Sequence, residues 1–80
     1  MKLHHIRAFL AVHEHGSLRA AAAALDMTQP ALTKSLKQLE KELGVTLFER
    51  SIRGMQATSF GRSFAVRARM ADAELRRGVE

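Results

Sequence analysis

A set of leucines spaced three and four residues apart constrains the fold of this chain more than any other feature. The set is Leu32, Leu36, Leu39 and Leu43. At about 100° per residue in an α-helix, these side chains cluster within roughly 60° of one another. Thr28 and Pro30 indicate where the helix begins, because threonine is a preferred N-cap and proline is tolerated in the first turn. We therefore predict a helix over residues 29–43, stopped by Gly44, with its leucine side buried.

The other side of this predicted helix carries cations, hydroxyls and an amide. It presents Pro30, Thr33, Lys34, Lys37 and Lys41, with Gln29 at the N-terminal tip. Lysines opposite a leucine side are usually just a solvated surface, and the helix alone leaves that interpretation open. The whole chain, however, has a formal net charge of +5. A small basic protein favours a polyanionic partner, most simply a nucleic acid.

Two further helices are predicted before this one. The first starts near Leu3 and stops at Gly16, and Ser17 is a suitable N-cap for the second. The second, LRAAAAAL, is rich in alanine, which favours a helix and lets another helix approach closely. Asp26 and Met27 leave a very short connection, and aspartate tolerates the left-handed backbone that a tight turn needs. Two helices joined in this way, the second basic on its outside, indicate a helix-turn-helix, a motif that reads the DNA major groove.

The pattern changes after Gly44. TLFERS predicts a short strand, IRG predicts a turn around Gly54, and MQATS predicts a weaker returning strand. Thr58 or Ser59 then caps a last helix with an apolar stripe. The stripe is Phe60, Phe64, Ala68, Ala71 and Leu75. The predicted fold class is therefore mainly α, with a three-helix core, a two-stranded hairpin and a long final helix.

The composition disfavours several functional classes. Eighty residues can form one domain with a small core, and the lack of cysteine excludes thiol catalysis, disulfides and thiolate metal sites. The four histidines lack the spacing of three or four residues that metal ligands on one helix need. No paired carboxylates indicate a catalytic site, and no apolar stretch approaches the roughly 20 residues of a membrane span. We expect neither an enzyme nor a metal or membrane protein.

Two segments resemble the N-terminal DNA-binding domain of LysR-type transcriptional regulators: FLAVHEHGSLRAAAAALDMTQPALTKSLKQLEKELGVTLFER and IRGMQATSFG. The specific element is A-A-x-x-L-x-x-[ST]-Q-[PS]-[AT]-[LV]-[ST] followed by Q-L-E-x-x-L-G-x-x-L-F-x-R, matched from Ala21 to Arg50. The resemblance implies a winged helix-turn-helix over residues 1–58. It also implies a linker helix over residues 59–80 that pairs with a second copy, and a separate effector-binding domain outside this chain.

The resemblance also assigns roles to particular residues. Thr28, Gln29, Pro30, Thr33 and Lys34 match positions that approach DNA at the start of the recognition helix, and Arg50 and Arg53 match positions in the wing. Lys37 is a further candidate, because its charge can reach a phosphate or a base. Two positions depart from the family. Lys34 stands where many relatives have arginine, which would grip guanine in a bidentate manner, and Ala57 stands where leucine is usual.

We interpret the chain as the DNA-binding domain of a bacterial transcription regulator that acts in the cytoplasm. It is expected to bind double-stranded DNA as a homodimer on a near-palindromic operator, with the recognition helix in the major groove and the wing in the minor groove. No cofactor is expected in this domain, whereas a small-molecule effector would bind the C-terminal domain. Tetramers of the full-length protein and contact with RNA polymerase remain open. The alternative is a helical protein-interaction or dimerisation module without specific DNA binding.

Overall fold

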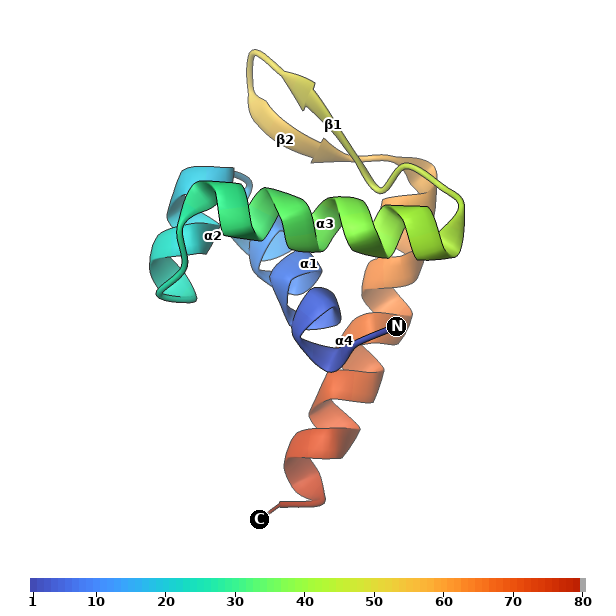
Figure 1. Ribbon diagram of the computed structural model, residues 1–80. Helices are drawn as coiled ribbons and strands as arrows, with labels where there is room; N and C mark the ends of the chain where they lie inside the picture. Colours follow the sequence, from blue (N-terminus) through green and yellow to red (C-terminus); the bar gives the residue numbers. More distant parts are fainter. Residues whose placement is uncertain (80) are drawn as a thin grey trace.

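The helices and strands follow one another in the predicted order. The computed structural model describes residues 1–79. Its elements are α1 (Leu3–His15), α2 (Leu18–Ala24), α3 (Gln29–Leu43), β1 (Phe48–Ser51), β2 (Gly54–Ala57) and α4 (Ser59–Arg77). In Figure 1, α3 lies across the front, the hairpin of β1 and β2 projects above it, and α4 descends behind to the C-terminus. This arrangement confirms the winged helix-turn-helix followed by a long helix.

Hydroxyl side chains define the starts of three helices. Ser17, Thr28 and Thr58 each accept a hydrogen bond from the backbone N–H three residues ahead, at 2.9, 3.2 and 3.1 Å. Each bond satisfies one of the donors that the start of a helix leaves free. The caps predicted for α2 and α3 are thus confirmed, and Thr58 rather than Ser59 caps α4.

The connection between α2 and α3 is a tight turn. Asp26 adopts a left-handed backbone with φ of 55°, as the sequence predicted for this position. The Met27 N–H donates to the Ala22 carbonyl at 2.9 Å and closes the turn. Because so short a connection fixes the crossing of the two helices, the N-terminus of α3 is held at the edge of the domain.

The leucine side of α3 lies in the core, as predicted. Leu32 and Leu39 are completely buried, Leu36 is nearly so, and Leu43 packs against the edge of the core. Phe9 of α1 is also completely buried. Burying large apolar side chains of this kind stabilises a domain by roughly 1.5–3 kcal/mol each. The core therefore holds α3 by one side and leaves the other side to solvent.

Phe9 also connects the helical core to the last two elements. Its ring centroid lies 5.2 Å from that of Phe48 in β1 and 5.1 Å from that of Phe64 in α4, the latter pair edge-to-face. Such offset and edge-to-face arrangements are the favoured geometries of aromatic pairs. The three rings therefore fix the hairpin and α4 against α1.

The hairpin is anchored to the turn between α1 and α2. Its strands are antiparallel, with Phe48 opposite Ala57 at the base and Ser51 opposite Gly54 at the tip. The Met55 N–H donates to the Gly16 carbonyl at 3.2 Å. Gly54 has φ of 101°, and a Cβ atom there would lie 2.7 Å from the same carbonyl oxygen. Only glycine fits this contact without a shift of the backbone. The contact therefore fixes the hairpin against the turn between α1 and α2.

Helix α4 is tied to α1 by an ion-pair network. Arg7 Nε donates to Asp72 Oδ1 at 2.9 Å, and Arg76 Nε donates to Asp72 Oδ2 at the same distance. The hydrogen bonds from Arg76 and Arg7 hold the pKa of Asp72 below its ordinary range. Beyond this network, the C-terminal end of α4 projects below the rest of the molecule (Figure 1). Within residues 1–79, none of the helices is long and apolar enough to cross a membrane.

Candidate nucleic-acid interface

The outward side of α3 forms an open groove together with β1. Most of the predicted contact residues line it. They are Gln29, Pro30, Thr33, Lys34, Lys37 and Arg50. All except the half-buried Thr33 are exposed. The structure thus brings the start of the recognition helix and one wing arginine to a single surface, which we call the α3 groove.

Thr28 has a structural role in addition to its predicted one. Its Oγ1 accepts from the Ala31 N–H at 3.2 Å, so one lone pair is committed to the helix start. A hydroxyl group has a donor as well as its acceptor lone pairs, and the Thr28 side chain is exposed. Thr28 can therefore cap α3 and still donate to a phosphate or a base edge.

The two predicted wing arginines lie in different places. Arg50 pairs with Met55 across the hairpin and its side chain lines the α3 groove. Arg53 lies in the turn at the hairpin tip, where its N–H donates to Ser51 Oγ at 3.1 Å, and it is exposed. The α3 groove does not include Arg53. The wing therefore presents one cation beside α3 and a second one at its far end.

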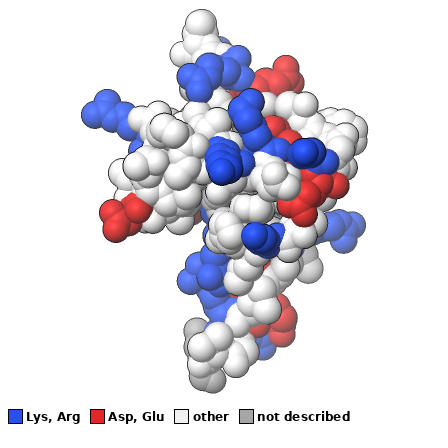
Figure 2. Space-filling model, in the orientation of Figure 1, with Lys and Arg blue, Asp and Glu red and all other residues white. Residues whose placement is uncertain are grey.

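Positive side chains dominate the face that contains α3 and the hairpin. Figure 2 shows Lys and Arg gathered over these elements, with acidic side chains mainly toward the edges. Two acids of α3 are engaged in other contacts. Glu40 Oε2 accepts from the Leu47 N–H at 2.6 Å, and Glu42 pairs with the N-terminal amine at 2.8 Å. The hydrogen bond from that amine lowers the pKa of Glu42. Glu42 is thus engaged away from the lysine row, whereas Glu40 lies in a groove with Lys37 and Arg50.

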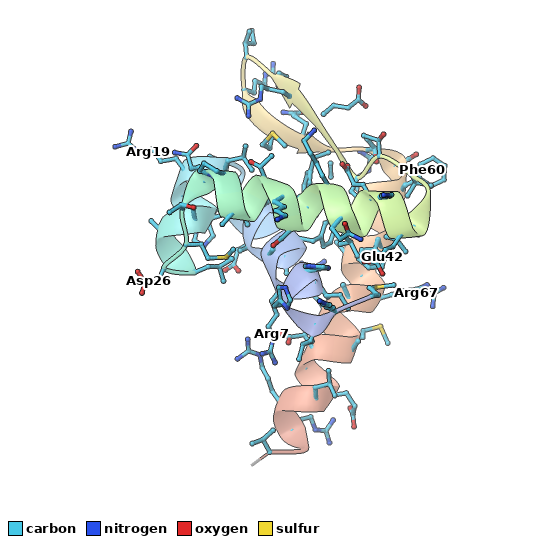
Figure 3. The ribbon with its side chains drawn as sticks, viewed as in Figure 1. Arg7, Arg19, Asp26, Glu42, Phe60 and Arg67 are labelled. Atoms are coloured by element: carbon cyan, nitrogen blue, oxygen red, sulfur yellow. The ribbon has the colours of Figure 1, made fainter. Side chains whose placement is uncertain are left out.

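Sequence reasoning missed part of this surface. A neighbouring groove between α2, α3 and the hairpin is lined by Arg19, Ser51 and Met55 as well as by Gln29 and Arg50. Arg19 points outward from α2 (Figure 3). The signal available in the sequence was the position of Arg19, two residues after the Ser17 cap and thus in the first turn of α2. In a helix-turn-helix, this first turn lies close to the recognition helix.

The stripe predicted for dimerisation is divided by the structure. Ala68 is 4% exposed and packs in the core, and Phe64 is half-buried against Phe9. Phe60 and Leu75 are 60% and 52% exposed, and Ala71 is also exposed. Phe60 points outward from the start of α4 (Figure 3). The five residues therefore do not form one free surface.

Other apolar side chains of α4 are exposed instead. Val66 and Met70 are 53% and 67% exposed, and neither belongs to the predicted stripe. The signal for this division was the set of small residues at Gly61, Ala65 and Ala68, which are the buried positions of α4. Small residues allow close packing, so they indicated which side of α4 is buried.

The remaining titratable cluster lies away from the α3 groove. His5 is nearly buried, and its Nδ1 lies 3.7 Å from Glu42 Oε1. Burial, followed by the neighbouring His4, lowers the pKa of His5. Within residues 1–79, the structure has no group of three or more His, Asp or Glu side chains placed to hold a metal ion. The cluster is therefore a packing contact between α1 and the end of α3.

Sequence comparison identifies the family. The family model described as "Bacterial regulatory helix-turn-helix protein, lysR family" matches residues 3–62. The transcriptional regulator AlsR of Bacillus subtilis is 42% identical over 80 residues, which are all of this chain and 26% of AlsR. GbpR of Azospirillum brasilense is 51% identical over 61 residues, covering 76% of this chain and 18% of GbpR. The chain thus spans about a quarter or less of these relatives.

Structure comparison agrees with the family match. The DNA complex of the CbnR DNA-binding domain has a TM-score of 0.92 and 38% identity, covering 98% of this chain and 90% of that one. The complex of the BenM DNA-binding domain with catB site 1 DNA has a TM-score of 0.95 and 37% identity, covering 99% and 89%. The chain therefore belongs to the LysR family of bacterial regulatory helix-turn-helix proteins, which are not enzymes, and is the DNA-binding domain of such a regulator.

Proposed function

We propose that this chain reads specific duplex DNA sites with the start of α3 in the major groove and the hairpin in the minor groove. The observation that carries the proposal is the α3 groove, which places Gln29, Pro30, Thr33 and Lys34 on one exposed surface beside Arg50. The major groove admits an α-helix, and the N-terminal residues of a recognition helix contact base edges. The homologous CbnR and BenM domains were solved bound to DNA, which supports DNA binding by this chain.

The side chains of the α3 groove divide into base-reading and phosphate-binding groups. The Gln29 amide both donates and accepts, so it can pair with an adenine edge, and Pro30 offers an apolar surface to a thymine methyl. Lys34 and Lys37 carry exposed charges that attract phosphates or the acceptors of guanine. Arg50 and Arg19, which share a groove with Gln29, are suited to the sugar-phosphate backbone. Sequence preference would then arise mainly from residues 29–34.

Arg53 suits the minor groove because it lies at the hairpin tip. Its side chain is exposed and lies outside the α3 groove. A narrow minor groove concentrates negative potential and attracts an inserted arginine. The anchoring of the hairpin through Met55 and Gly16 keeps this cation at a fixed position relative to α3.

We further propose that two copies pair through the solvent side of α4. The exposed apolar residues of α4 are Phe60, Val66, Met70 and Leu75, of which Val66 and Met70 lie opposite the buried Gly61, Ala65 and Ala68. These side chains are available to a partner, whereas Phe64 and Ala68 are occupied within the chain. A two-fold dimer would place two α3 helices on a near-palindromic site, about one helical turn of DNA apart or a multiple of it.

We also propose that this domain belongs to a longer regulator. The chain covers 26% of AlsR, so we propose that the full-length protein carries a further domain that binds a small-molecule effector. Tetramer formation and contact with RNA polymerase would belong to that longer protein. Its site of action would be the bacterial cytoplasm, where chromosomal DNA is accessible.

Selection of bound sites from random duplexes tests this proposal. We expect one enriched near-palindrome, and we expect its affinity to fall steeply with salt, because each neutralised phosphate releases counterions. Replacing both Lys34 and Lys37 by Ala should flatten the salt dependence. A helical interaction module without DNA specificity would enrich no sequence. That result would overturn the proposal.

A further inference from the structure

The tip of the hairpin exposes a large apolar side chain. Ile52 has a relative exposure of 104% and is the most exposed of the large hydrophobic residues in the described chain. The others lie within residues 1–3 and 60–79, at the N-terminus and along α4. Ile52 is thus the only one of this set on α2, α3 or the hairpin within the described residues. Single exposed apolar residues are common, so its surroundings must decide whether it has a role.

The turn itself does not need an isoleucine. Ser51 Oγ accepts from the Arg53 N–H at 3.1 Å and donates to the Gly54 carbonyl at 3.2 Å, and Gly54 supplies the positive φ of 101°. These contacts define the turn without the Ile52 side chain. Turn positions usually hold Asn, Asp, Ser, Pro or Gly, whereas a β-branched side chain gains its packing inside a sheet. Ile52 therefore serves neither the core nor the turn.

The neighbours of Ile52 are cationic and belong to the DNA-facing surface. Arg53 follows Ile52 in the turn. Arg50, two residues before Ile52 in β1, lines the α3 groove. Both arginines are exposed. An apolar group held between two cations at the end of a basic surface is suited to a ligand with an anionic rim and a less polar interior. The DNA minor groove has this character, with phosphates along its edges and sugars along its walls.

We propose that Ile52 enters the minor groove beside Arg53 and makes the wing discriminate against guanine. This inference rests on the proposed DNA-binding function. In the minor groove, G·C pairs add the guanine N2 amino group, whereas A·T pairs present only acceptors. One N–H of that amino group is paired with cytosine, and an isoleucine side chain over the other would leave this free donor without a partner, which is costly. Minor-groove proteins do insert apolar side chains, isoleucine included, although as wedges between base steps. Arg53 supplies attraction, and Ile52 supplies selectivity.

Inosine substitution isolates the minor groove. An inosine·cytosine pair has the major-groove edge of G·C without the N2 amino group. A hydroxyl-radical footprint of the wild-type chain and of Arg53→Ala on the selected duplex would first locate the sugars that the wing covers. Duplexes carrying A·T, G·C or inosine·cytosine at those pairs would then be compared at one salt concentration.

We expect the wild-type chain to bind the A·T and inosine·cytosine duplexes alike and the G·C duplex about tenfold more weakly, the usual scale for one unsuitable pair. Ile52→Ser should reduce the difference between inosine and guanine to less than about twofold. Ile52→Val is the matched control and should keep the difference. Because Ile52 is fully exposed, the thermal unfolding of both variants should match the wild type.

Two results would overturn the inference. One is a wild-type chain that prefers its selected site but does not distinguish inosine from guanine under the wing. The other is an Ile52→Ser variant with undiminished discrimination. Both leave the proposed function intact, because preference for the selected site persists. A chain that binds no duplex in preference to another overturns the proposed function and this inference with it.

Discussion

Glu40 of α3 accepts a hydrogen bond from the backbone N–H of Leu47, with 2.6 Å between Oε2 and N, and a longer one of 3.4 Å from Phe48. Leu47 is almost completely buried. The recognition helix therefore holds the start of β1 through one carboxylate. The wing is held at its other strand by the bond between Met55 and Gly16. These two attachments set the distance between α3 and the hairpin.

Replacing Glu40 by Ala should loosen the wing as well as the fold. The Leu47 N–H would lose its partner in a buried place, which costs roughly 1–3 kcal/mol. Denaturant unfolding should show that loss, and affinity for the selected duplex should fall further than stability explains at temperatures where the variant is folded. Glu49→Ala is the control, because Glu49 is an exposed acid of the same hairpin. Equal effects of the two substitutions would contradict the role of Glu40.

Gly61→Ala should destabilise the domain. A Cβ atom at this position would overlap the carbonyl oxygen of Leu47 and crowd the Ala57 side chain. Overpacking of this kind costs about 1–3 kcal/mol, although alanine is the better helix former. Gly78→Ala is a matched control with its nearest neighbour at 3.4 Å. If Gly61→Ala unfolded at the same denaturant concentration as the wild type, α4 would not pack this closely against Leu47 and Ala57.

The stability that the ion pairs between α4 and α1 contribute should be lost at acid pH. Arg76 and Arg7 hold the pKa of Asp72 below its ordinary value of 3.8. A carboxyl group with a lowered folded-state pKa contributes stability above its unfolded value, and that contribution is lost as pH falls through the folded value. Asp72→Asn should therefore be less stable than the wild type near neutral pH. The difference should shrink below about pH 4.

His5 provides an internal reference for that titration. Burial and His4 lower its pKa from the ordinary 6.5, so the folded state resists protonation and loses stability as pH falls below 6.5. The wild type and Asp72→Asn share this loss, and their unfolding free energies should run parallel between about pH 7 and pH 5. If the difference in unfolding free energy between the wild type and Asp72→Asn disappeared between about pH 7 and pH 5, it would not come from the titration of Asp72.

Met70→Glu should convert the proposed dimer into a monomer without unfolding it. Met70 is 67% exposed on the solvent side of α4, so a carboxylate there would disfavour an apolar contact between chains but not the core. Sedimentation equilibrium would measure the change, with Ala23→Glu on exposed α2 as the charge-matched control. In contrast, Phe64→Glu should lower thermal stability, because Phe64 packs on Phe9. If the Met70→Glu chain dimerised like the wild type, the surface around Met70 would be excluded as the dimer interface.

The sequence predicts α3 well because several independent signals agree there. The Thr28 cap, Pro30 in the first turn, the leucine spacing and the Gly44 stop all define one helix and one buried side. The hairpin was predicted from short strand patterns around Gly54, but its attachments were not. The contacts from Glu40 to Leu47 and from Met55 to Gly16 join segments whose proximity no local pattern encodes.

Helix α4 shows where sequence reasoning fails. Helical spacing places Phe60 and Ala68 on one side of this helix, about 80° apart, yet Phe60 in its first turn is exposed and Ala68 lies in the core. On the same side, Phe64 packs on Phe9 and Asp72 pairs with Arg7 of α1. A helical wheel cannot show which part of this side is covered until the position of α1 is known. For α3 the wheel was sufficient, since Pro30, Thr33, Lys34 and Lys37 all lie opposite a single leucine side.

The most direct test of base reading by α3 is the ratio of affinities for the selected duplex and an unrelated duplex at one salt concentration. For Gln29→Ala this ratio should fall on the order of tenfold or more, with affinity for the unrelated duplex unchanged. Arg53→Ala should weaken binding to both duplexes to a similar extent and leave the ratio nearly intact. If Gln29→Ala kept the wild-type ratio, or lost affinity for both duplexes equally, sequence would not be read by the start of α3.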